Sequence, residues 1–120
     1  MPNPGATAPG YNLDVNEFTH REVPRLGRRL FRLGLSGSFD LDEAGCREAL
    51  ERMQYVFWSP RMKALTPALR DALARDRGRY VVSAGPLLGY FPGAVRRAAE
   101  TERRTLDVDF LVVFQLGWLG

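Results

Sequence analysis

The chain has 120 residues, a length that suits one domain with a modest hydrophobic core. With 45% hydrophobic and 26% charged residues, its composition excludes a largely disordered chain. The net charge of +3 is dispersed among acidic residues rather than gathered in a basic run, which argues against nucleic-acid binding. No apolar run reaches the length of a membrane span, so no membrane association is expected.

Residues 1–16 are predicted to form a disordered leader, because they are rich in proline, glycine and alanine and show no periodicity. They lack the charged-then-apolar pattern of a secretion signal. Cys46 is the only cysteine, which excludes an intramolecular disulfide and favours the cytoplasm. Residues 17–120 are then expected to form one domain.

The segment Glu17–Gly27 is short and mixed, and it predicts a small hairpin or turn. It contains His20, the only histidine of the chain. No second histidine or nearby cysteine could share a metal with it, and no serine or aspartate lies at a useful spacing. We therefore expect no metal site and no catalytic role for His20.

Leu30–Ser36 is predicted as the first strand, followed by a glycine-containing turn. Asp40 or Asp42 can cap a helix that runs through Arg52, in which Cys46 is expected to be a small buried hydrophobe. Glycines before a helix can also bind an anion through free backbone amides. The turn lacks both the dinucleotide-binding spacing and the lysine of a phosphate-binding loop, so a plain turn is favoured.

Further strands and helices alternate along the rest of the chain. The predicted order is strand Met53–Trp58, helix Ala68–Arg77 capped by Thr66-Pro67 and closed by Gly78, strand Tyr80–Ala84, helix Pro92–Leu106 and strand Val108–Trp118. The last strand is a continuous apolar run, which is typical of a strand buried on both faces of a parallel sheet. The alternation predicts an α/β fold built from right-handed βαβ units.

Several of these segments resemble the first half of an aldo/keto reductase. The last strand carries Asp109-Phe110-Leu111 and Phe114-Gln115-Leu116, similar to the family's Asp-Tyr-Leu-Asp-Leu-Phe-Gln-Leu-His-Trp. Arg25-Leu26-Gly27, Phe31-Arg32-Leu33-Gly34-Leu35 and Glu48-Ala49-Leu50-Glu51-Arg52 are similar to earlier pieces of the family, in the same order. The resemblance implies four of the βα units of a (β/α)₈ TIM barrel, a fold that usually takes about 250 residues.

The resemblance implies NADPH-dependent carbonyl reduction for the family, in which a tyrosine acts as general acid beside an aspartate, a lysine and a histidine. At the matching positions this chain has Phe57 for the aspartate, Met62 for the tyrosine, Gly85 for the lysine and Gly117 for the histidine. We therefore expect no catalytic residues. NADP(H) is implied by the family alone, and this chain is not expected to bind it unaided, since the family's phosphate contacts come mostly from the seventh and eighth strands.

The polar and aromatic residues left at the predicted strand ends are the candidates for a binding pocket. Trp58, Lys63 and Trp118 are the substrate-pocket candidates, and Tyr90 and Phe91 are the other polar or aromatic residues at these ends. The alternative interpretation is that the two tryptophans cap the hydrophobic core.

Three functions remain open at this point. The chain can be a truncated, inactive fragment or paralogue of an aldo/keto reductase; a non-catalytic interaction module; or a small-molecule binder that uses the tryptophan-lined mouth. Four parallel strands leave two open sheet edges, so we expect a homo-oligomer, a partner chain that completes the barrel, or a marginally stable monomer.

Overall fold

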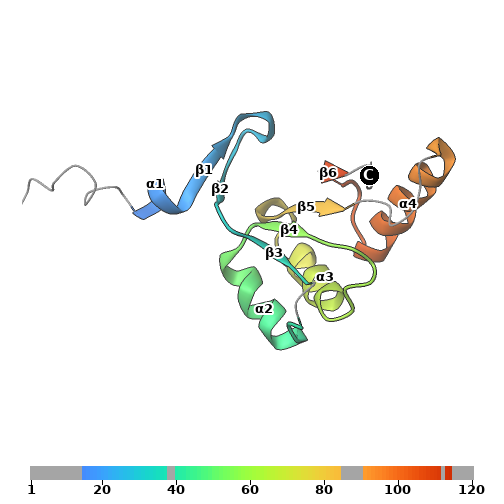
Figure 1. Cartoon of the computed structure of the whole chain (residues 1–120), viewed down its shortest axis with the longest axis horizontal. Helices are drawn as coiled ribbons and strands as arrows, with labels where there is room; N and C mark the ends of the chain where they lie inside the picture. The colour runs from blue at the N-terminus through green and yellow to red at the C-terminus, as the bar shows by residue number, and fades with distance from the viewer. Residues whose placement is uncertain (1–14, 38–39, 85–90, 112, 115–120) are drawn as a thin grey trace, which may run out of the picture. The chain divides into compact units, whose positions relative to one another are not determined.

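The computed structural model describes residues 15–37, 40–84, 91–111 and 113–114 (Figure 1). The chain divides into two compact units, residues 1–32 and residues 33–120. Residues 1–14 of the predicted leader lie outside the described residues, and residues 15 and 16 already belong to the first helix.

The first unit is a β-hairpin preceded by a short helix. It contains α1 (Val15–Thr19), β1 (His20–Val23), the 3-10 turn η1 (Pro24–Leu26) and β2 (Arg28–Phe31). Strands β1 and β2 pair in antiparallel fashion, so a hairpin is present, but its second strand lies beyond Gly27, where the predicted hairpin or turn ended. Gly27 closes the connection with a left-handed φ of 59°, where its N–H donates to the Pro24 carbonyl. The His20 ring meets the Phe31 ring edge-on at 5.4 Å, so the histidine serves packing here.

The prediction of a single strand over Leu30–Ser36 is wrong. Strand β2 ends at Phe31, and β3 (Gly34–Ser36) begins after the exposed residue Leu33. The two halves have different partners, because Leu30 lies opposite Arg21 in the hairpin whereas Leu35 lies opposite Val56 in the other sheet. Hydrophobic periodicity reports burial but carries no information about which strand is the partner.

The second unit is a four-stranded parallel sheet with helices between its strands (Figure 1). Its strands are β3, β4 (Tyr55–Phe57), β5 (Val81–Ala84) and β6 (Val113–Phe114), paired in that order. Its helices are α2 (Glu43–Arg52), α3 (Leu65–Arg75) and α4 (Pro92–Leu106), with the 3-10 turn η2 (Arg77–Arg79) before β5. The predicted parallel α/β architecture is confirmed, and the described strands form an open sheet rather than a closed barrel.

The core lies between one face of this sheet and the helices. Alternate strand residues such as Val56 and Val82 meet helix residues such as Leu50 and Leu69, and all four are at most 2% exposed. Each such side chain contributes roughly 1.5–3 kcal/mol through burial. Cys46 is fully buried in the same cluster, as predicted.

The helix boundaries follow local capping chemistry. Asp42, rather than Asp40, caps α2, because its carboxylate accepts a hydrogen bond from the Gly45 amide at 2.7 Å. Helix α4 has the predicted bounds. The predicted cap at Thr66 is wrong: α3 already begins at Leu65, and the Thr66 hydroxyl donates to the carbonyl of Met62, which precedes the helix.

The final predicted strand is shorter in the described residues than the apolar run indicated. Asp107 adopts a left-handed φ of 56° after α4, and residues 108–111 of the predicted strand are not in a strand, whereas Val113–Phe114 form β6. Phe110 is 59% exposed, and its ring stacks under the Arg77 guanidinium, 4.5 Å from the ring centroid. Val113 and Phe114 are half-buried, so burial on both faces is wrong for the described part. Residues 112 and 115–118 of this prediction lie outside the described residues.

Candidate functional site

The carboxyl ends of the parallel strands bring one row of side chains together. Ladder pairing places Ser36, Phe57, Ser83 and Val113 side by side across the sheet. Since Val56 and Trp58 face the core, Phe57 lies on the opposite face of the sheet. Active sites of parallel βα folds lie at this end of the strands.

This row contains little that could catalyse a reaction. Phe57 offers a phenyl ring that is 37% exposed, at the position that the resemblance assigns to the aspartate. Ser83 is fully buried, and its hydroxyl oxygen has no hydrogen-bond partner among the described residues. A serine without an adjacent base is a weak nucleophile. Phe57 therefore supplies no proton donor, and Ser83 has no adjacent base among the described residues.

Met62 occupies the position that the resemblance assigns to the tyrosine, and its side chain packs against other residues. Its half-buried side chain lies against the hydrophobic core. A Cβ built on Gly37 would lie 3.2 Å from the Met62 Cβ and 3.1 Å from the Leu65 Cβ, so the turn after β3 closes tightly on this position. Gly85 and Gly117, at the lysine and histidine positions, lie outside the described residues.

The two described pocket candidates differ in burial. Trp58 is fully buried, and its indole N–H donates to the Thr66 hydroxyl at 2.9 Å. Lys63 is exposed in the turn between β4 and α3. Neither residue lines the two described surface cavities. Trp118 and Tyr90 lie outside the described residues, and Phe91 is 75% exposed before α4.

One carboxyl group in the core is electrostatically perturbed. Glu102 of α4 is only 3% exposed, and its Oε2 atom has no hydrogen-bond partner among the described residues. Burial disfavours the charged form and raises the pKa of the Glu102 carboxyl to about 7. A perturbed carboxyl of this kind can mark a functional site, but Glu102 lines neither described cavity.

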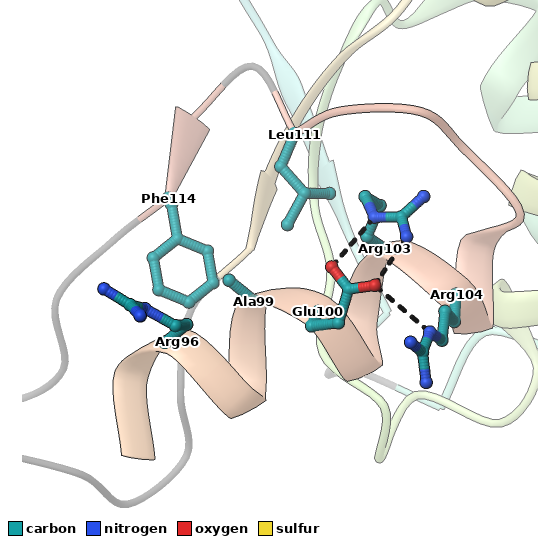
Figure 2. Close-up of a pocket in the computed structure, with 7 residues that line it drawn as sticks. All are labelled: Arg96, Ala99, Glu100, Arg103, Arg104, Leu111 and Phe114. Atoms are coloured by element: carbon teal, nitrogen blue, oxygen red, sulfur yellow. Dashed lines mark hydrogen bonds and ion pairs between the residues drawn. The ribbon is translucent and has the colours of Figure 1, made fainter. Parts of the chain in front are cut away.

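An arginine-rich groove runs between α4 and β6 (Figure 2). It has a volume of about 650 Å³. Its lining residues are Arg96, Ala99, Glu100, Arg103, Arg104, Leu111 and Phe114. Glu100 pairs with Arg103 at 2.6 Å and with Arg104 at 3.1 Å, and these hydrogen bonds, led by that of Arg103, lower the pKa of the Glu100 carboxyl.

Sequence reasoning did not identify this groove. Arg96, Glu100, Arg103 and Arg104 recur at the spacing of one helical face, a signal that was available. The missing information was the position of Leu111 and Phe114, which supply the apolar wall from a separate segment.

The described residues contain no cluster of three or more metal-ligating side chains. Within the same residues, no helix combines the length and apolar character needed to cross a membrane.

A scan against protein-family models and a search of curated proteins both returned no match. Eight solved chains match in structure. One, described as a putative aldo-keto reductase from Pseudomonas aeruginosa, matches 84% of this chain with a TM-score of 0.65 and 21% sequence identity. This chain spans about half of that protein, 46% of its length. The open parallel sheet and its covering helices therefore have the fold of part of an aldo-keto reductase barrel.

Proposed function

We propose that this chain is a polypeptide of the aldo/keto reductase lineage that does not itself reduce carbonyl compounds. The observation that carries the proposal is Phe57, an apolar ring at the end of β4 where the resemblance calls for a carboxylate. A phenyl ring carries no negative charge and so cannot replace that carboxylate, and the thioether of Met62 cannot donate a proton. The match in fold to an aldo-keto reductase supports the lineage.

The proposal extends to the cofactor and the compartment. The chain covers 46% of the structural neighbour, and the resemblance does not include the strands that hold the nucleotide phosphates in the family. We therefore infer that this chain alone does not bind NADP(H). A single thiol, buried at Cys46, suits the reducing conditions of the cytoplasm.

NADPH titration tests the proposal. The purified chain is expected to leave NADPH fluorescence unchanged up to millimolar nucleotide, and to cause no carbonyl-dependent loss of NADPH absorbance. An intact aldo/keto reductase assayed in parallel is the positive control. Saturable NADPH binding would refute the inference about the cofactor, and carbonyl-dependent turnover would refute the loss of catalysis.

A second candidate function is an interaction module that self-associates or completes a barrel with a partner chain. The edges of the sheet favour it: in the described residues β3 pairs only with β4, and β6 pairs only with β5. Open strand edges present unpaired backbone groups to other chains. Leu33, beside β3, is 61% exposed, and Phe110, before β6, is 59% exposed.

Sedimentation velocity over a range of concentrations tests this second candidate. The chain is expected to sediment as a dimer or larger species at micromolar concentration. Leu33→Lys is expected to weaken the association, whereas Ala44→Lys, on the exposed face of α2, is the matched control. A monomer at every concentration would overturn self-association.

A further inference from the structure

The groove between α4 and β6 has a volume of about 650 Å³, and the proposed function leaves it unused. Its floor is apolar, formed by Ala99 of α4 and by Leu111 and Phe114, which reach toward the helix from the following segment (Figure 2). All three side chains are half-buried. They would lose further contact with water if another element covered them.

The topology indicates what kind of element fits. The helices pack in the order of their strands, α2 against α3 and α3 against α4. A further helix in the row α2, α3, α4 would pack against α4 on the side that faces β6, and the groove lies there. An α-helix is the element that fills each equivalent place in a parallel βα fold.

The charges of the groove define the chemistry of that helix. Three arginines and one glutamate line it, which leaves two net positive charges. Arg103 is fully engaged, because it pairs with Glu100 and also donates to the Val108 carbonyl at 3.0 Å. Arg104 uses only Nε on Glu100, and Arg96 has no ion pair with a described residue. Arg96 and Arg104 are therefore positioned to pair with carboxylates of an incoming helix.

The same charges argue against a second copy of this chain in the groove. A two-fold contact would place the groove of one copy against the groove of the other. Arg96 and Arg104 would then face the arginines of the other copy, and like charges in contact oppose association.

We propose that the groove between α4 and β6 is a docking site for an amphipathic helix of a partner chain, with carboxylates flanking an apolar stripe. The proposal rests on the second candidate function, because it names the chemistry of the partner that the interaction module would bind. The apolar stripe covers Ala99, Leu111 and Phe114, and the carboxylates pair with Arg96 and Arg104.

Fluorescence anisotropy with the full chain tests the proposal. The probe is a labelled helical peptide with leucine on one face and glutamate on both flanks, and the control peptide has lysine in place of each glutamate. The glutamate peptide is expected to bind with an affinity that falls as salt is raised. Arg96→Glu and Arg104→Glu are each expected to weaken binding roughly three- to tenfold. Arg97→Glu is the matched control, since Arg97 is exposed on α4 but does not line the groove.

Three results would overturn the proposal: equal binding of the lysine peptide, equal effects of Arg96→Glu and Arg97→Glu, or complete competition by millimolar inorganic phosphate. The last would assign the arginines to a small anion instead. If the chain self-associates but does not bind the glutamate peptide, the partner chemistry is wrong and the second candidate function stands. If the chain is monomeric yet binds the peptide as described, self-association fails and the docking site stands.

Discussion

Replacing Glu102 by glutamine is expected to stabilise the fold at neutral and alkaline pH. Burial raises the pKa of the Glu102 carboxyl from 4.5 to about 7, while the unfolded chain keeps the ordinary value. As pH rises from the unfolded to the folded pKa, the unfolded state loses a proton that the folded state retains, so the free energy of unfolding falls. A difference of about 2.5 between the folded and unfolded pKa of Glu102 lowers the free energy of unfolding by about 3 kcal/mol once the carboxyl is ionised in both states.

Urea denaturation of the parent chain and of Glu102→Gln at about pH 5 and about pH 8 measures this effect. The advantage of the variant over the parent is expected to grow by about 2.5 kcal/mol between these two pH values. Glu48→Gln, at an exposed position on α2, is the control and is expected to show no such growth. Ion pairs such as that of Glu100 with Arg103 are common to all three proteins, so their pH dependence cancels. If Glu102→Gln is more stable than the parent chain by the same amount at both pH values, the argument that burial destabilises the ionised Glu102 carboxylate is refuted.

Three further predictions concern stability and are checked by thermal or urea unfolding. Trp58→Phe is expected to cost about 1–3 kcal/mol, because it removes volume from the core and the hydrogen bond to Thr66; a loss near zero would contradict the packing described for the indole. Asp42→Ala is expected to cost about 1 kcal/mol through loss of the α2 cap, and Asp42→Asn should retain most of it. Asp107→Gly is expected to stabilise by about 0.5–1 kcal/mol, because glycine adopts the left-handed conformation freely; destabilisation would show that the Asp107 side chain has a role of its own.

Local chemistry allowed parts of the fold to be predicted from the sequence. Pro92 fixes the start of α4, and Asp42 supplies the cap of α2, so both helices could be located before the structure. Local signals of this kind could not show that Leu30–Ser36 is divided between two sheets. The division depends on which strand each half meets, and only long-range pairing decides that.

The candidate site was predictable only in part. The replacement of a carboxylate by Phe57 is visible in the sequence, and the structure adds that the ring stands at a strand end on the face away from the core. The burial of Trp58 was one of two interpretations, and the choice between them required the position of Thr66. The groove beside α4 depends on residues from two separate segments, so helical spacing alone could not reveal its apolar wall.

Because Cys46 is buried, its reaction with a thiol reagent can be used to measure local unfolding of the chain. Its thiol is inaccessible to water, and burial first, then the nearby Asp42 and Glu43, raise its pKa and leave little reactive thiolate. A thiol reagent can therefore modify the folded chain only during excursions that expose Cys46 to water. Because no other cysteine exists, the modification rate reads the free energy of those excursions without engineering a label.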